Sequence, residues 1–416
     1  MSFFNNPICT SKIFAAFIFC SLTITVYAQP LTKVLQNDSV YSTLYGFADY
    51  YGAGNAVTNK FMSAYIKNNF LDDELKQSVY DNLKDKNKLA YHLETGIGFI
   101  HKKNKWGWMV QFQNQAHSAS QFGSDLFRLY FGGNAQFKGE TANLDNFDFN
   151  SIQFQSLGAG LLYHNTSKKL DWQLAIMPSI VKGQTAYKAN SDGGLYTSSL
   201  SDSLYFDMNV AANFSDTATR KFSAWNGTGM MTDIYFRFGE DKNWLVTISL
   251  TNLGNVSWNA KSGSLLIDTN YAYTGIEIAN ILDSITLQIN GTEEYKNSLL
   301  QYTTDNFTTT LPSVIDMMVQ KSFANDNLHL GIGFRNVNDK VATPQFYFTS
   351  DYKLSSHLII GANLYSGGYK PFSAALTARL SFGKFFIAPS VSYLEEIFRG
   401  NKGTATGAGV VAGWRF

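Results

Sequence analysis

The C-terminal segment, residues 404–416, alternates between two kinds of side chain and ends on an aromatic residue. Successive side chains of a β-strand point to opposite faces, so this alternation defines the two faces of one strand. The apolar face suits lipid and the other suits a wet interior. The apolar face carries Ala408, Val410, Ala412, Trp414 and Phe416, and the other carries Gly407, Gly409, Gly413 and Arg415. We therefore predict a membrane-spanning strand, with the terminal aromatic residue that barrel-assembly machinery reads.

Residues 1–28 have the pattern of a secretory signal peptide. Lys12 precedes an apolar run that continues to Val26, and Ala28 supplies the small residue expected before a cleavage site. The run is short for a bilayer span, which favours cleavage over anchoring. Both cysteines, Cys9 and Cys20, lie in this segment. We therefore expect a mature chain without a disulfide, a thiolate metal site or a cysteine nucleophile.

The composition restricts the class of protein further. Without Lys12 the chain has 32 basic and 32 acidic residues, and this balance argues against nucleic acid as a partner. No later apolar run reaches the length of a transmembrane helix, whereas 33 glycines and 15% aromatic residues suit strands and tight turns. Lipid offers backbone N–H and C=O groups no partner, so strands that cross a membrane must close into a barrel.

The alternating segments predict an all-β fold, a transmembrane antiparallel β-barrel of about fourteen strands, an even number as in bacterial barrels. Closure requires 404–416 to pair with 91–100. The barrel is expected to span residues 90–416, with long outer loops at 183–224 and 257–309. Trp106, Trp108, Trp172, Trp244, Tyr352 and Trp414 lie near strand ends on the apolar face, as an interfacial girdle would. The predicted strands are 91–100, 106–116, 125–137, 151–163, 170–182, 225–238, 243–256, 310–323, 327–336, 343–352, 358–366, 371–382, 384–394 and 404–416.

Residues 29–89 precede the predicted barrel and contain an amphipathic pattern. Leu71, Leu75, Val79 and Leu83 recur every four residues among charged neighbours, which predicts a helix of about four turns. Such a helix could pack against the periplasmic rim, or it could enter the lumen as a plug. The sequence alone leaves both alternatives open.

The chain lacks the common motifs that carry catalytic chemistry. It has no Gly-x-Ser-x-Gly, His-Glu-x-x-His or Gly-x-x-x-x-Gly-Lys motif, and its six histidines do not have the spacing of metal ligands. We therefore predict no enzyme activity, catalytic residue, metal or cofactor. The informative residues are ionisable side chains on the face away from lipid. These candidate lumen-facing residues are His92, Glu94, Asp171, Asp233, Arg237, His329, Arg335, Asp351 and Arg379. They predict either a filled, salt-bridged lumen or a polar conduit.

Three short segments carry a resemblance to a known family. They are residues 132–139 (Gly-Gly-Asn-Ala-Gln-Phe-Lys-Gly), residues 250–258 (Leu-Thr-Asn-Leu-Gly-Asn-Val-Ser-Trp) and Thr310-Leu311-Pro312. The chain resembles an uncharacterised family of outer-membrane barrels from bacteria that use type IX secretion, with an architecture similar to the fatty-acid-transporter (FadL-like) barrels. The resemblance implies fourteen strands, long outer loops and an N-terminal segment folded into the barrel. It identifies no site residue.

Two functions fit these observations. The first is passage of a hydrophobic or small solute across the bacterial outer membrane. The second is a non-transporting structural or accessory barrel for secretion or surface assembly, which binds protein partners through its outer loops. Either protein would contact outer-membrane lipid and the barrel-assembly machinery. A continuous conduit would favour the first function, and a plugged lumen with a partner surface would favour the second.

Overall fold

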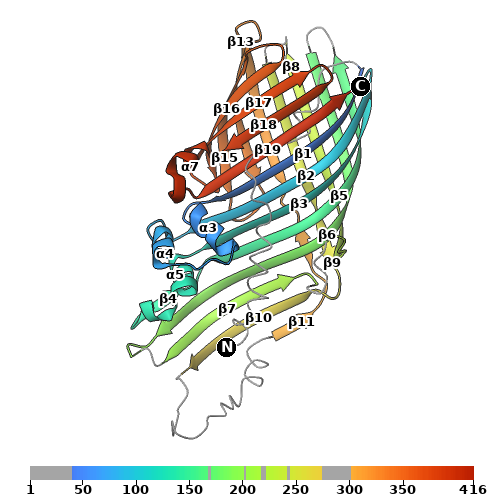
Figure 1. Ribbon diagram of the computed structural model, residues 1–416. Helices are drawn as coiled ribbons and strands as arrows, with labels where there is room; N and C mark the ends of the chain where they lie inside the picture. The colour runs from blue at the N-terminus through green and yellow to red at the C-terminus, as the bar shows by residue number, and fades with distance from the viewer. Residues whose placement is uncertain (1–39, 167–169, 201–202, 217–221, 241–243, 274–300) are drawn as a thin grey trace.

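The computed structural model describes residues 40–166, 170–200, 203–216, 222–240, 244–273 and 301–416. In these residues fourteen antiparallel strands form a closed barrel (Figure 1). The strands are β1 (Val40–Gly54), β2 (Asn87–Lys103), β3 (Trp106–Phe122), β5 (Phe147–Thr166), β6 (Leu170–Thr197), β8 (Gly227–Glu240), β9 (Trp244–Trp258), β13 (Val314–Phe323), β14 (Leu328–Val337), β15 (Thr343–Lys353), β16 (Leu358–Gly368), β17 (Phe372–Phe382), β18 (Phe385–Ser392) and β19 (Ala405–Arg415). The predicted fold class and strand number are confirmed. The predicted signal peptide lies outside the described residues.

The barrel closes where its first strand meets its last. β1 pairs with β19 from Thr43 opposite Arg415 to Ala53 opposite Ala405, and β1 pairs with β2 on its other side. The prediction that 404–416 pairs with 91–100 is therefore wrong, because β1 stands between these two segments. The barrel begins at residue 40 and not at residue 90. Closure leaves the wall without an unpaired edge, as lipid requires.

The sequence concealed β1 because three of its aromatic side chains point inward. Tyr45, Phe47 and Tyr51 are buried inside the barrel, whereas the small Gly46 and Ala48 lie on the outer face between them. This arrangement reverses the usual pattern of apolar residues toward lipid and polar residues toward the lumen. Residues 40–54 were consequently assigned to the N-terminal segment 29–89.

The second error in the strand assignment compensates for the first. Residues 125–137, predicted as a strand, form helix α5 (Ser124–Gly132) and the short 3-10 helix η1 (Asn134–Phe137). Phe127 and Phe131 are four residues apart, which places both rings on one helical face with a centroid distance of 4.5 Å. One false strand and one missed strand cancel, so the total stayed correct.

Three helices pack together at one end of the barrel. They are α3 (Asn59–Ile66) and α4 (Asp73–Tyr80) in the β1–β2 connection, and α5 in the β3–β5 connection. The Asp72 side chain caps α4 by accepting the Leu75 N–H, which is 2.8 Å away. Phe61, Leu75 and Val79 are buried together in one apolar cluster.

The position of α4 excludes both arrangements considered for the predicted helix. Bacterial barrels have short periplasmic turns and longer extracellular loops. The helices lie at the end with the long connections, here called the outer end, away from the C-terminus (Figure 1). The helix of Leu71, Leu75, Val79 and Leu83 is therefore shorter than expected, and it is neither periplasmic nor a lumen plug. It packs with α3 and α5 beside the outer strand ends.

Extra strands extend one side of the wall beyond the barrel. β6 has 28 residues, far more than the 9–11 that a tilted strand needs to cross a membrane. Its outer half pairs with β4 (Thr141–Asn143) and β7 (Leu204–Phe214), and β7 pairs with β10 (Gly263–Tyr273), which pairs with β11 (Gln301–Thr304). β12 (Thr308–Thr310) pairs with β9. The described parts of the predicted outer loops 183–224 and 257–309 are therefore largely sheet, on the predicted side.

The two faces of the wall differ in chemistry. Large apolar side chains are exposed on the outer face, among them Leu161, Ile180 and Phe346. Trp106, Trp108, Trp244, Tyr352 and Trp414 are each about half exposed and lie near the short turns, as expected for an interfacial girdle.

Among the described residues, no helix combines the length and the apolar character needed to span a membrane.

Candidate functional site

The inner face of the barrel encloses a polar cavity of about 50 Å³, here called the lumen cavity. A space of this size holds roughly four water molecules. Most of its lining comes from β1, β2, β3, β8, β9 and β14. The lining residues are Asp49, Tyr51, His92, Glu94, Gln111, Gln113, Gln115, His117, Asp233, Tyr235, Thr251, Asn252, Pro312, Val314, Arg335 and Val337.

A β-bulge in β9 brings one amide into this cavity. The β8–β9 register shifts between Thr232 and Ile234, so that Thr251 and Asn252 both stand opposite Asp233. Asn252 adopts φ +58°, a conformation that asparagine tolerates better than most residues. Its backbone N–H donates to Asp233 Oδ1 at 2.7 Å. The bulge thereby turns the Asn252 side chain inward and fixes the Asp233 carboxylate.

Polar side chains connect separate parts of the wall across the lumen. The amides of Gln115 on β3 and Asn252 on β9 exchange two hydrogen bonds, of 3.0 and 3.3 Å. The Gln115 amide also donates to Glu94 Oε1 at 2.9 Å, and Glu94 Oε2 lies 3.8 Å from His92 Nε2. Three strands separate β3 from β9 in the barrel order. The network therefore joins distant strands rather than neighbours.

A row of glutamines on β3 faces the same cavity. Gln111, Gln113 and Gln115 are all buried. Tyr45 donates its hydroxyl hydrogen to Gln111 at 2.7 Å, and Gln111 Nε2 donates to Gln113 Oε1 at the same distance. Gln113 Nε2 and His92 Nδ1 have no hydrogen-bond partner among the described residues. Because buried polar atoms are normally satisfied, these two atoms are candidate positions for hydrogen bonds to water or a polar ligand.

A loop from the opposite side of the barrel reaches this cavity. Residues 338–342, here called the latch loop, connect β14 to β15. Asp339 Oδ2 lies 3.3 Å from His117 Nε2 and accepts the Tyr369 hydroxyl, while Oδ1 accepts the Val341 and Ala342 N–H groups. In the barrel order, five strands lie between β3 and β14 on one side and seven on the other. The latch loop therefore crosses the outer mouth of the lumen.

The partners of Asp339 in and beside the latch loop keep its carboxylate ionised. Burial alone would raise the pKa of Asp339, but hydrogen bonds from His117, the Ala342 N–H and Tyr369 outweigh burial and lower that pKa below 3.8. The side chains of both Asp339 and His117 are only 2% exposed. A buried, charge-assisted contact of this kind is stronger than an exposed one.

The structure places the residues predicted from the sequence in two groups. His92, Glu94, Asp233 and Arg335 line the lumen cavity together. The others lie elsewhere along the inner face, and most have local partners. Asp171 contacts His164, Asp351 accepts from Gln320, His329 contacts Ser322, Arg379 lies over the Phe386 ring, and Arg237 stands opposite Gln173.

Sequence reasoning missed the neutral residues of this site. Gln111, Gln113, Gln115 and His117 recur at period two, a visible signal for one strand face. The prediction omits the three glutamines because it considers only ionisable side chains, and it omits His117 because the predicted strand 106–116 ends one residue too early. Asn252 and Asp339 gave no such signal, since a bulge and a long-range contact position them. Among the described residues, no cluster of histidine, aspartate and glutamate has metal-binding geometry.

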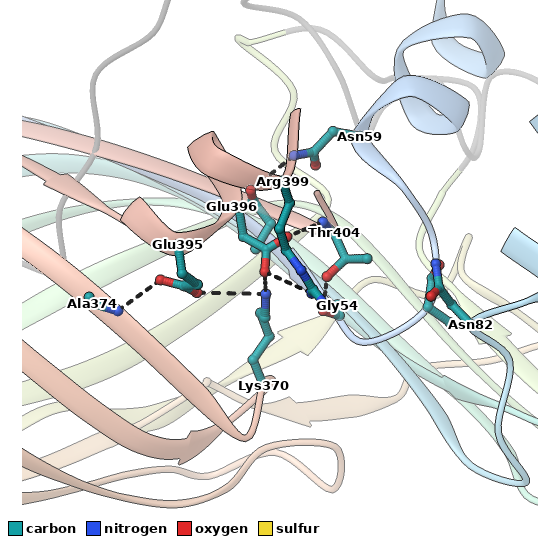
Figure 2. Close-up of polar contacts among 11 residues, drawn as sticks. Gly54, Asn59, Asn82, Lys370, Ala374, Glu395, Glu396, Arg399 and Thr404 are labelled. Carbon is teal, nitrogen blue, oxygen red and sulfur yellow. Dashed lines mark hydrogen bonds and ion pairs between the residues drawn. The ribbon is translucent and has the colours of Figure 1, made fainter. Parts of the chain in front are cut away.

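A second buried charged cluster lies at the outer end of the β1–β19 seam (Figure 2). Helix α7 (Leu394–Arg399), between β18 and β19, places Glu396 where it contacts the Lys370 ammonium and accepts the Thr404 N–H at 2.6 Å. Thr404 in turn donates to the Gly54 carbonyl at 2.9 Å, at the end of β1. Burial lowers the pKa of Lys370 to about 8, opposed by the Glu395 carboxylate. Each of these contacts is internal, so the cluster fastens the seam.

The fold and the polar lumen define a transmembrane β-barrel of the outer-membrane type. The chain belongs to the family of unknown function DUF5723, whose model matches residues 43–388. No curated protein matches the chain. The predicted association with type IX secretion stays a prediction.

Solved structures of other barrels resemble the chain. The Pseudomonas putida toluene transporter TodX is 6% identical, with a TM-score of 0.44 over 97% of this chain and 95% of that one. The Ralstonia pickettii toluene transporter TbuX is 8% identical, with a TM-score of 0.42 over 95% of each chain. A Pseudomonas aeruginosa FadL homologue is 8% identical, with a TM-score of 0.41 over 90% and 89%. At these identities no residue role passes from those proteins to this chain.

Proposed function

We propose that this protein resides in the bacterial outer membrane and passes a small polar solute through its lumen, with the latch loop as the gate. The lumen cavity under the latch loop is the observation that carries this proposal. Its walls combine carboxylates, amides, imidazoles and a guanidinium. Such a lining replaces the hydrogen bonds that a polar solute makes with water.

The lining favours a polar solute over the hydrophobic one that the sequence left open. A hydrophobic molecule in this space would leave lining groups such as Gln113 Nε2 and His92 Nδ1 without a partner. A buried polar group without a partner costs about 1–3 kcal/mol. Several such groups would therefore exclude an apolar solute of this size.

The strength of the latch sets how often the gate opens. Asp339 accepts hydrogen bonds from two backbone N–H groups and a tyrosine, and it contacts His117. Hydrogen bonds to a charged group contribute about 1.5–3 kcal/mol each, part of which water recovers when the latch loop moves. A net free energy of about 3–4 kcal/mol for opening the latch loop leaves roughly 0.1–1% of molecules open. This fraction gives rare, brief openings.

Single-channel recording in planar bilayers tests the gate. We expect rare openings of the wild-type protein and an increase in open probability of about a hundredfold in Asp339→Ala, which removes the side-chain contacts of Asp339 with His117, Tyr369 and the loop N–H groups. Lys340→Ala is the matched control in the same loop, because the Lys340 side chain is 74% exposed and an ion pair as exposed as the one with Asp148 contributes little. If the wild type and Asp339→Ala both fail to conduct although both are folded, the lumen is not a conduit.

An accessory barrel is the second candidate, and the sheet extension of β6, β7, β10 and β11 favours it. This surface projects from the outer end (Figure 1). Tyr205 on β7 is 45% exposed. If the extension serves type IX secretion, Tyr205→Ser should reduce secretion of cargo in cells while leaving conductance unchanged. Normal secretion by Tyr205→Ser would count against a partner at this residue.

A further inference from the structure

Negative charge exceeds positive charge in the lumen cavity. Three carboxylates line it, from Asp49, Glu94 and Asp233, against the single guanidinium of Arg335. Arg335 stands directly opposite Asp316 in the β13–β14 register, so its charge is shared with a carboxylate outside the lining.

Two of these carboxylates are direct cross-strand neighbours. Asp49 on β1 and Glu94 on β2 are paired in register, and both face inward. Like charges at opposite positions on adjacent strands destabilise a sheet. A cation between the two carboxylates relieves this repulsion, so the position favours a bound positive charge.

Neutral groups hold two of the carboxylates in place. Glu94 Oε1 accepts from the Gln115 amide at 2.9 Å, and Asp233 Oδ1 accepts from the Asn252 N–H at 2.7 Å. Both donors orient a carboxylate without cancelling its charge. This differs from the seam cluster, where Lys370 contacts Glu396 directly.

An independent observation points to a ligand in the same space. Gln113 is 3% exposed and lines the cavity, yet its Nε2 has no hydrogen-bond partner among the described residues. An amide N–H₂ group binds an oxygen, such as that of a water molecule. The volume of about 50 Å³ suits a small ion together with a few waters.

We propose that the lumen cavity is a binding site for a small monovalent cation with part of its water shell, and that the conduit therefore selects cations. Glu94 and Asp49 supply the charge on one side, and Asp233 supplies it on the other. Gln113 binds a water of the ion. This inference rests on the proposed passage of a polar solute and names the class of that solute.

Reversal potentials in a potassium chloride gradient test the inference, with every variant made in the Asp339→Ala background so that the gate is open. We expect potassium to be preferred over chloride. Glu94→Gln and Asp233→Asn keep the hydrogen bonds to Gln115 and Asn252 and remove one charge each. Each substitution should lower the cation-to-anion permeability ratio by about fivefold. The interaction energy of two unit charges a few ångströms apart in water corresponds to a factor of about this size.

Asp171→Asn is the matched control. It also removes an inward carboxylate, but Asp171 lies outside the lumen cavity and contacts His164 near the short turns. The ratio should stay unchanged in this variant. A chloride preference, or an equal effect of Asp171→Asn, would overturn the cation site. Absence of any conductance in the folded Asp339→Ala background would instead reject the proposed passage itself.

Ions of different size test the volume of the site. Ammonium should carry current nearly as well as potassium, whereas tetraethylammonium should carry none and should block potassium from one side. Free permeation of tetraethylammonium would show that the conduit bypasses the lumen cavity. Heat-modifiable migration on gels confirms that each variant still contains a folded barrel.

Discussion

At the scale of single residues, the buried charged side chains of this barrel have polar partners. Glu396 shows the principle most clearly, since it is 3% exposed and contacts Lys370, Arg399 and the Thr404 N–H. A buried carboxylate is tolerated only when its partners replace the lost water. The cost of removing one partner is therefore larger than the net contribution of the pair.

Glu396→Ala should destabilise the folded barrel by about 3–5 kcal/mol, because it leaves the Lys370 ammonium buried beside only Glu395. Glu396→Gln should cost less, since an amide oxygen still accepts the Thr404 N–H. Urea unfolding in lipid vesicles, followed by tryptophan fluorescence, measures the difference. Lys402→Ala, at an exposed residue of the same connection, serves as the control. Equal stability of Glu396→Ala and wild type would show that the cluster does not fasten the seam.

Acid should open the latch. The pKa of Asp339 in the latched state lies below its ordinary value of 3.8, so the contribution of this carboxylate to the latch is complete above 3.8 and is lost as the pH falls through the lowered value. The groups that face Asp339 are His117 from β3, Tyr369 from the β16–β17 turn and Lys88 from β2. We expect the open probability in planar bilayers to rise once the pH falls below 3.8. This rise in open probability should be absent in Asp339→Ala, whose gate is already open. A rise at low pH that persists in this variant would come from the titration of another group.

At the scale of elements, a bulge explains two of the segments that carry the family resemblance. Residues 250–258 contain the bulge at Asn252, and Thr310-Leu311-Pro312 lies against it. The Leu311 N–H donates to the Gly254 carbonyl at 3.0 Å, and the Asn252 amide donates to the Pro312 carbonyl at 3.4 Å. These short motifs therefore build one structural feature, which aims a polar side chain into the lumen.

Two substitutions at Asn252 separate the backbone of the bulge from its side chain. Asn252→Val should cost about 1–2 kcal/mol for the left-handed backbone alone, in addition to the lost hydrogen bonds. Asn252→Gly adopts the same backbone without strain and keeps the N–H bond to Asp233, while the amide contacts with Gln115 are lost. We expect the valine variant to be the less stable in urea unfolding. Both variants lack the amide, so equal stability, or the reverse order, would mean that the left-handed backbone at residue 252 does not limit stability.

At the scale of the whole molecule, the wall is uneven in height. Strands β13 to β19 have 8–11 residues, close to the length that crosses a membrane, whereas β2, β3, β5 and β6 have 17–28. The long side continues into the extra strands at the outer end, and the short side ends at the seam cluster. Both sides meet where β1 closes the barrel against β19.

Removing Phe416 should reduce assembly into the outer membrane more than it reduces synthesis. Phe416 is 66% exposed at the membrane interface, and its N–H donates to the Ser42 carbonyl at 2.9 Å, which extends the closing ladder. The deletion removes both this bond and the terminal aromatic side chain. The ratio of folded to total protein in membrane fractions measures the effect. Phe416→Tyr is the conservative control, and normal assembly of the deletion would contradict this role.

The sequence by itself determined the class of fold. Period-two alternation such as that of residues 404–416, without a long apolar helix after residue 28, requires a closed barrel because lipid leaves no backbone group unpaired. It also indicated four residues that line the lumen cavity, because a charged side chain on the face away from lipid must point inward. These inferences need only local pattern and the chemistry of the solvent.

Only the tertiary structure decided how the barrel closes and what its lumen contains. The closing strand β1 carries its aromatic residues inward, and residues 125–137 form helical turns, so local alternation misassigned both. The contact of Asp339 with His117 joins residues 222 positions apart. It depends on strand order around the ring and on a loop that folds across it. Neither property is written in any short segment, because side chains converge in the lumen through closure and not through sequence proximity.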